Sequence, residues 1–186
     1  MKRILSLLLF VFILAGCRTT EDNMDRAIAF RQELLNKAGC RFDCELTADY
    51  GEILYKFSIQ CESDNMGNIS FVISAPDSIS GITGGISNDG GRISFDECVL
   101  GFPILSENLP TPLCAPWIFM KGLRSGYIRT CDYEKGRMVL MIADTYEEDA
   151  ILMEMQFDEQ EIPISCEYIW KGRRIMSMTI TSFTYL

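Results

Sequence analysis

The chain has 186 residues, and its 26 acidic residues outnumber its 17 basic ones, which gives a formal net charge of −9. This excess of negative charge disfavours nucleic acid as a partner, because the phosphate backbone attracts cations. Histidine is absent from the sequence. Its absence excludes Ser-His-Asp and Cys-His catalytic pairs and every zinc site that contains histidine, and with them most familiar hydrolase chemistry.

The N-terminal segment has the features of an export signal. Basic residues at 2–3 precede an apolar run over 4–14, which at about a dozen residues is well short of the ~20 that a membrane-spanning helix needs. The run ends in Leu-Ala-Gly-Cys at 14–17, which resembles the lipobox of bacterial lipoproteins. In that family the cysteine thiol receives a diacylglyceryl group before the chain is cleaved. We therefore expect residues 1–16 to be a signal peptide and Cys17 to be the lipid attachment site.

The expected lipid on Cys17 makes the membrane a partner of the mature protein. Two or more acyl chains on one residue give stable anchoring, so we expect an exported protein that is lipid-anchored to the bacterial cell membrane. The acidic domain would gain nothing from anionic headgroups, so the lipid would anchor it alone. Residues 17–23 are polar after the cysteine and are predicted to be a tether. Residues 24–186 suit one domain with a core of ordinary size.

The domain begins with one predicted helix and continues with strands. Apolar residues recur at helical spacing over 26–38, and Gly39 follows where a helix would end. From Cys40 the apolar period becomes two, which is typical of strands, and the Asp-Gly pair at 89–90 indicates a hairpin tip. The predicted strands cover 40–46, 53–61, 69–75, 79–87, 92–99, 127–133, 137–143, 150–157, 162–170 and 173–183.

The predicted fold is mainly β with α insertions. Its connections are too short for parallel crossovers, which predicts an antiparallel arrangement of about ten strands. The segment 103–126 is rich in proline and ends in a predicted short helix. Residues 138–143 are apolar throughout and 151–155 nearly so, which predicts strands that are dry on both faces. A curved antiparallel sheet or half β-barrel, with an N-terminal helix and a mid-chain helical lid, satisfies these patterns.

The concave side of such a sheet is the predicted ligand cavity, either open to a ligand or filled by the helices. Methionine is frequent in the second half of the chain, and its flexible thioether suits a site that receives acyl chains, although core packing explains each one equally well. The candidates are three residues at the end of the proline-rich insertion and four methionines of the later strands: Trp117, Phe119, Met120, Met138, Met141, Met153 and Met155.

The order of elements resembles the lipoprotein-carrier (LolA/LolB/LppX-like) superfamily, which includes outer-membrane lipoprotein carriers and mycobacterial lipid-binding lipoproteins. The most specific local match is the segment 71–82, which reads Phe-Val-Ile-Ser-Ala-Pro-Asp-Ser-Ile-Ser-Gly-Ile. The resemblance implies an open β-barrel with helical lids, an apolar pocket for acyl chains and no catalysis. The cysteine content and the separate lipid anchor depart from that pattern and argue against soluble shuttling.

Other constellations in the sequence have plainer interpretations. Without Cys17 an odd number of cysteines remains, so at least one thiol is free or the protein works where thiols stay reduced. Zinc binding by Cys40, Cys44, Cys61 and Cys98 is disfavoured, because strands rarely bring four ligands together. The glycine-rich segment 81–85 lies in a hairpin without a following helix, and the acidic turn 144–149 is typical of solvated charge. We expect no metal and no cofactor.

Three functions are compatible with these patterns. The leading hypothesis is a membrane-anchored, non-catalytic lipoprotein that binds an apolar ligand, either a lipid or the acyl chains of a lipoprotein, in the half-barrel. The alternative is a surface or structural lipoprotein with a closed core, whose partner is another protein. A cysteine-based redox enzyme is the third and the least supported by the sequence.

Overall fold

A computed structural model describes residues 18–106 and 109–186. The predicted signal peptide and Cys17 lie outside these residues. The described residues form two α-helices, a short 3-10 helix and thirteen strands. The elements are α2 (Arg18–Asn36), β1 (Gly39–Asp49), β2 (Leu54–Asp64), β3 (Ile69–Ala75), β4 (Thr83–Ser87), β5 (Gly90–Phe95), β6 (Cys98–Phe102), β7 (Leu105–Ser106), β8 (Leu109–Pro110), η1 (Pro112–Cys114), α3 (Ala115–Ser125), β9 (Tyr127–Glu134), β10 (Arg137–Ala143), β11 (Leu152–Phe157), β12 (Pro163–Trp170) and β13 (Arg173–Tyr185). Neither described helix is both long enough and apolar enough to cross a bilayer.

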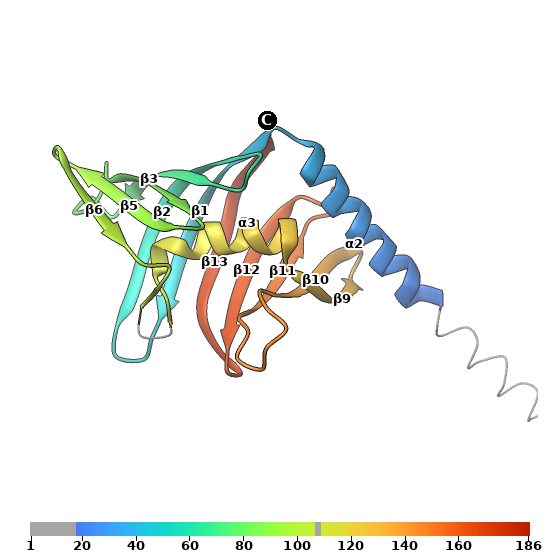
Figure 1. Cartoon of the computed structure of the whole chain (residues 1–186). Helices are drawn as coiled ribbons and strands as arrows, with labels where there is room; N and C mark the ends of the chain where they lie inside the picture. The colour runs from blue at the N-terminus through green and yellow to red at the C-terminus, as the bar shows by residue number, and fades with distance from the viewer. Residues whose placement is uncertain (1–17, 107–108) are drawn as a thin grey trace, which may run out of the picture.

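Eleven strands form one antiparallel sheet in the order β6-β5-β4-β3-β2-β1-β13-β12-β11-β10-β9. The sheet is curved and is not closed into a barrel, because β6 and β9 remain unpaired edges (Figure 1). This confirms the predicted fold class of a curved antiparallel sheet with an N-terminal and a mid-chain helix. The first and last strands, β1 and β13, pair in the middle of the sheet, so the two halves of the chain form its two wings.

The predicted strand over 92–99 is wrong, because this segment is a hairpin of β5 and β6. The chain reverses at Asp96 and Glu97, and both have a left-handed backbone, with φ of 48° and 67°. Two consecutive residues with positive φ make the tight turn that suits the twist of a hairpin. The turn contains no glycine or asparagine, which is why the sequence pattern missed it and predicted one strand too few.

Two further element boundaries differ from the predictions. Helix α2 begins at Arg18, whereas the predicted helix began at 26, so the segment 18–23 that was predicted to be a tether is helical. This stretch contains neither proline nor glycine, so nothing in it interrupts a helix that forms further along the chain. Strand β4 begins at Thr83, and 76–81 form a turn in which the N–H of Gly81 donates to the carbonyl of Ile73 at 2.9 Å.

The core lies on the concave face of the sheet. Along β1, Phe42, Cys44 and Leu46 are buried and alternate with residues that are less buried, as expected for a strand with one packed face. Helix α3 crosses the inner side of the curved sheet, and α2 lies toward its β9 edge (Figure 1). The ring of Phe30 from α2 meets Phe157 of β11 edge to face, with ring centroids 5.0 Å apart.

The expectation that the strands of the second half are dry on both faces is wrong in part. On β10, Met138, Leu140 and Ile142 are buried, whereas Val139 and Met141 on the opposite face are half-buried. Both helices pack against the concave face, so the other face is shielded only by neighbouring side chains.

Candidate ligand-binding site

Helix α3 is the element around which the candidate site is built. Its start is set by proline, since Pro112 opens η1 and Pro116 lies in the first turn of α3. Its first carbonyl, that of Ala115, accepts a hydrogen bond of 2.7 Å from the buried hydroxyl of Tyr168 on β12. The helix ends where the N–H of Gly126 donates to the carbonyl of Gly122. Most of its side chains are buried, because the helix lies within the curve of the sheet.

The residues predicted to form a lid are packed against the sheet. Phe119 is buried and meets Phe42 of β1 edge to face, with ring centroids 5.8 Å apart. The sulfur of Met120 lies 3.7 Å from the thiol of Cys40, also on β1. Trp117 is buried as well, but its side chain borders a cavity. Helix α3 therefore fills most of the concave side instead of covering an empty half-barrel.

Three of the four candidate methionines lie on the buried, concave face of the sheet, and the fourth does not. Met138, Met153 and Met155 are buried on the concave face. A Cβ atom on Gly122 of α3 would lie 2.7 Å from Cε of Met153, so the absence of a side chain at Gly122 lets the helix approach β11 closely. Met141 was predicted to line the cavity, but it is out of phase with Met138 and points to the convex face.

A cavity of about 270 Å³ remains beside α3. Its wall is largely apolar and comes from four parts of the chain: α3, the β4–β5 turn, the segment after β6, and the connection between β10 and β11. Polar atoms come from Asn88, Lys121, Ser125 and Asp144. The apolar residues that line it are Ile104, Leu105, Trp117, Ile118 and Ile151.

Of the seven predicted cavity residues, only Trp117 lines this cavity. The other apolar wall residues were missed by the sequence analysis. Ile118 follows Trp117 in the same predicted helix. Its position beside a candidate cavity residue is the one signal in the sequence that could have found it. Ile104 and Ile151 belong to connecting segments, and no local pattern places a connection against a helix far away in the chain.

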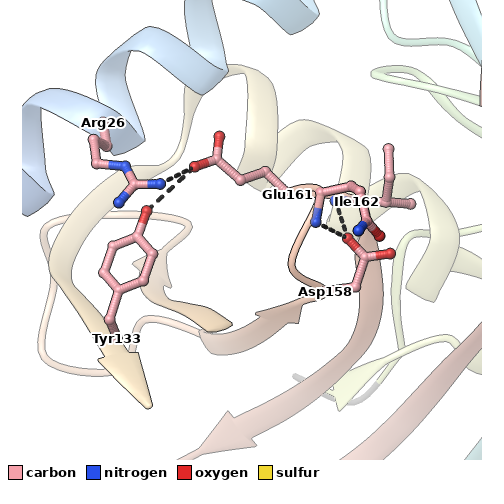
Figure 2. Close-up of polar contacts among 6 residues, drawn as sticks. Arg26, Tyr133, Asp158, Glu161 and Ile162 are labelled. Carbon is pink, nitrogen blue, oxygen red and sulfur yellow. Dashed lines mark hydrogen bonds and ion pairs between the residues drawn. The ribbon is translucent and has the colours of Figure 1, made fainter. Parts of the chain in front are cut away.

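Helix α2 is held to the sheet by a polar cluster at the β9 edge (Figure 2). The guanidinium of Arg26 donates to Glu161 at 2.7 Å and lies 4.4 Å from the ring centre of Tyr133. The turn that presents Glu161 is closed by Asp158, whose carboxylate accepts the N–H of Ile162 at 2.9 Å. Burial, reinforced by the negative charge of Glu161, raises the pKa of Tyr133 to about 12. The cluster is suited to positioning α2, because its tyrosine stays protonated and its carboxylate is already paired.

Helix α2 also contacts the end of α3 directly. The guanidinium of Arg31 donates to the carbonyl of Leu123 at 2.7 Å and to that of Gly122 at 3.2 Å. A cation at the C-terminal end of a helix is favourable, since the free carbonyls there carry partial negative charge. Arg31 thus links the helix that follows the predicted anchor to the helix that forms the cavity wall.

The thiols are placed for packing. The described cysteines form no disulfide, and all except Cys98 are buried. Burial raises the pKa of Cys40 and of Cys114 to about 12, and that of Cys131 to about 11. Cys98 is exposed on the edge strand β6, away from the cysteines of β1 and β2. In the described part of the chain, no three cysteine, aspartate or glutamate side chains are grouped as metal ligands.

Comparison with known proteins gives likeness in structure only. No family model matches the chain, and no curated protein sequence matches it. A structure of the CwlD amidase in complex with the GerS lipoprotein from Clostridioides difficile matches at 13% identity and a TM-score of 0.48, over 88% of this chain and 95% of the matched chain.

Two other solved structures are similar at lower scores. A LolA superfamily protein from Nitrosomonas europaea matches at 8% identity and a TM-score of 0.44, over 85% of this chain and 92% of that one. The lipoprotein LppX from Mycobacterium tuberculosis matches at 10% identity and a TM-score of 0.41, over 85% of this chain and 93% of that one. At these values no ligand, partner or activity is carried over to this chain.

Proposed function

We propose that this protein is a lipid-anchored binding protein that takes an apolar chain into the cavity beside α3, without catalysis. Residues 1–16 would be removed on export, Cys17 would carry the lipid, and residues 24–186 would be the binding domain. Because α2 begins at Arg18, the helix would follow the anchor directly and the domain would stay close to the membrane surface.

The single observation that supports this function best is the apolar cavity on α3. Clefts that bind small molecules are mostly apolar with a few polar groups, and they commonly measure about 300–1,000 Å³. At about 270 Å³ the cavity is slightly smaller than that range, which suits one chain and not several. Met153 and Met155 lie directly behind the wall at Gly122, and their flexible thioethers can adjust to a guest.

The proposal is tested with the chain from residue 18 onward, produced without the leader. Organic extraction and mass spectrometry of the purified protein should find a co-purifying lipid, and the protein should bind the fluorescent fatty acid cis-parinaric acid. Replacing Ile104→Trp fills the cavity and should weaken binding about tenfold, a loss of about 1.4 kcal/mol. The matched control is Ile82→Trp, since Ile82 is also partly buried but lies outside the cavity. Absence of both lipid and uptake would refute the function.

A second function is supported by a separate surface. The β5–β6 hairpin at one edge of the sheet exposes Phe95, Val99 and Leu100, which are 57%, 65% and 64% accessible. An apolar edge strand offers unpaired backbone groups to another protein. If the cavity stays empty, we expect a protein partner recovered from intact cells to be lost in the Leu100→Lys variant. Recovery of the same partner by this variant would rule out the hairpin as its binding surface.

A further inference from the structure

A second pocket adjoins the apolar cavity and has a different chemical character. It measures about 100 Å³ and shares Asn88, Trp117, Lys121 and Ser125 with the cavity. Trp117, Lys121 and Ser125 are spaced four residues apart on α3 and therefore form one ridge of the helix. This ridge separates the second pocket from the apolar cavity. Beyond the ridge, the second pocket is lined by Asn68 and Arg124, whereas the cavity has Ile118 and Gly122.

The second pocket carries two cations. The Lys121 ammonium lies 4.9 Å from the ring centre of Trp117, at the rim that both spaces share. The Arg124 guanidinium donates to the carbonyl of Asn65 in the β2–β3 turn. Among the described residues, neither cation has a carboxylate within 4.0 Å, whereas the five salt bridges use Arg26, Lys37, Arg41, Arg173 and Arg174. Two such cations side by side are notable on a chain whose net charge is −9.

Two carboxylates near this site already have partners. Asp144 borders the apolar cavity, and its carboxylate accepts the N–H of Ile151 at 2.8 Å. Asp64 in the β2–β3 turn accepts the side-chain amide of Asn68 at 2.8 Å and the N–H of Met66 at 2.8 Å. The positive charge of Lys121 and Arg124 is therefore available to a ligand.

We infer that Lys121 and Arg124 bind the anionic head of a single-chain amphiphile, a carboxylate or a phosphate monoester, whose tail enters the apolar cavity. The inference rests on the proposed function and adds the class of ligand to it. Hydrogen bonds between two cations and an oxyanion are stronger than neutral ones, and Asn68, Asn88 and Ser125 supply further polar groups around the head. The small cavity limits the tail to one chain.

The test compares three ligands with the same oleoyl chain, measured by displacement of cis-parinaric acid from the chain that begins at residue 18. This chain contains both helices and the whole sheet, and its core is assembled from Ala27 onward. Oleic acid and oleoyl lysophosphatidic acid should bind about tenfold more tightly than uncharged 1-oleoylglycerol. In Lys121→Gln and in Arg124→Gln this difference should fall below about threefold, with a smaller change in the affinity for 1-oleoylglycerol than in the affinities for the two anions.

Two controls separate a charge effect from a structural one. Lys121→Arg keeps the charge and should keep the preference for anions, and Lys56→Gln, an exposed residue of β2 outside both spaces, should change nothing. Equal binding of all three ligands would overturn this inference and leave the proposed function standing, whereas binding of none would overturn both. Displacement by inorganic phosphate as readily as by lysophosphatidic acid would show a site for free anions and would also overturn it.

Discussion

At the scale of single residues, the thiols are kept unreactive by their surroundings. A thiol reacts as the thiolate, and burial disfavours that charged form. The raised pKa values of Cys40, Cys114 and Cys131 therefore place them above the pH at which most reagents act. This environment argues against the redox enzyme considered from the sequence.

A thiol titration tests this assignment. With Ellman's reagent at about pH 8, near the ordinary pKa of a cysteine, we expect one thiol of the native chain from residue 18 to react quickly, and the other six only after unfolding. The fast thiol should be Cys98, because it is exposed. The Cys98→Ser variant should therefore lose the fast phase. Rapid reaction of Cys44 or Cys166 in the native protein would contradict the packing described here.

The seating of α3 depends on one glycine. In Gly122→Ala the new Cβ meets the flexible ends of Met153 and Met155, which can turn aside, and alanine favours a helix by about 1 kcal/mol over glycine. We expect the free energy of unfolding to stay within about 1 kcal/mol of the parent. Gly122→Leu should lower it by about 1–3 kcal/mol through overpacking. Urea titrations measure both, and equal stability of the two variants would show that α3 does not lie against β11 at this point.

At the scale of elements, α2 is attached by two arginines in different environments. Arg26 forms its ion pair with Glu161 at the surface, where its side chain is 56% accessible. Arg31 is half-buried, and burial lowers its pKa, yet its donors are satisfied by two carbonyls of α3. Exposed ion pairs contribute little because water screens them, whereas a charged hydrogen bond in a partly buried position contributes more.

Methionine substitutions separate the two attachments while keeping the aliphatic length. Arg31→Met should lower the free energy of unfolding by about 1–2 kcal/mol and increase amide exchange in α2. Arg26→Met should change it by less than about 1 kcal/mol, and that small effect should shrink further at high salt. A larger loss for Arg26→Met than for Arg31→Met would reverse this ranking of the two contacts.

At the scale of the whole molecule, α3 joins the two wings of the sheet. Phe119 packs on Phe42 of β1, and Gly122 lies against Met153 on β11 in the other wing. The wings also share the β1–β13 pair at the centre of the sheet. We therefore expect neither wing to keep its core when the other unfolds, because both use the same helix to cover their concave face.

This arrangement predicts one cooperative unfolding transition. Tryptophan fluorescence reports on Trp117 in α3 and Trp170 in β12, while far-ultraviolet circular dichroism reports on the sheet. The two signals should give the same midpoint in urea, as a two-state domain requires. Separate midpoints would mean that the β2–β6 wing and the β9–β12 wing are independent folding units.

Local structure and the class of fold could be predicted from the sequence, including several strands to within a residue or two, such as 69–75. Period-two alternation and short connections are properties of neighbouring residues, so they can be read without knowing the partners. Sequence analysis missed the turn at Asp96 and Glu97 and the start of α2. No residue type at these positions marks the boundary of an element.

The order of the strands in the sheet and the position of the cavity follow only from the packing of the folded chain. The side chains of Asp43 and Ser182 are hydrogen-bonded across 139 positions of sequence, and Ile104 and Ile151 meet at one wall beside α3. A periodic sequence pattern does not predict contacts between residues so far apart in the chain, because each such contact depends on the free energy of packing the entire chain. For the same reason Met141 was assigned to the cavity by its residue type, and the pleat of β10 placed it on the other face.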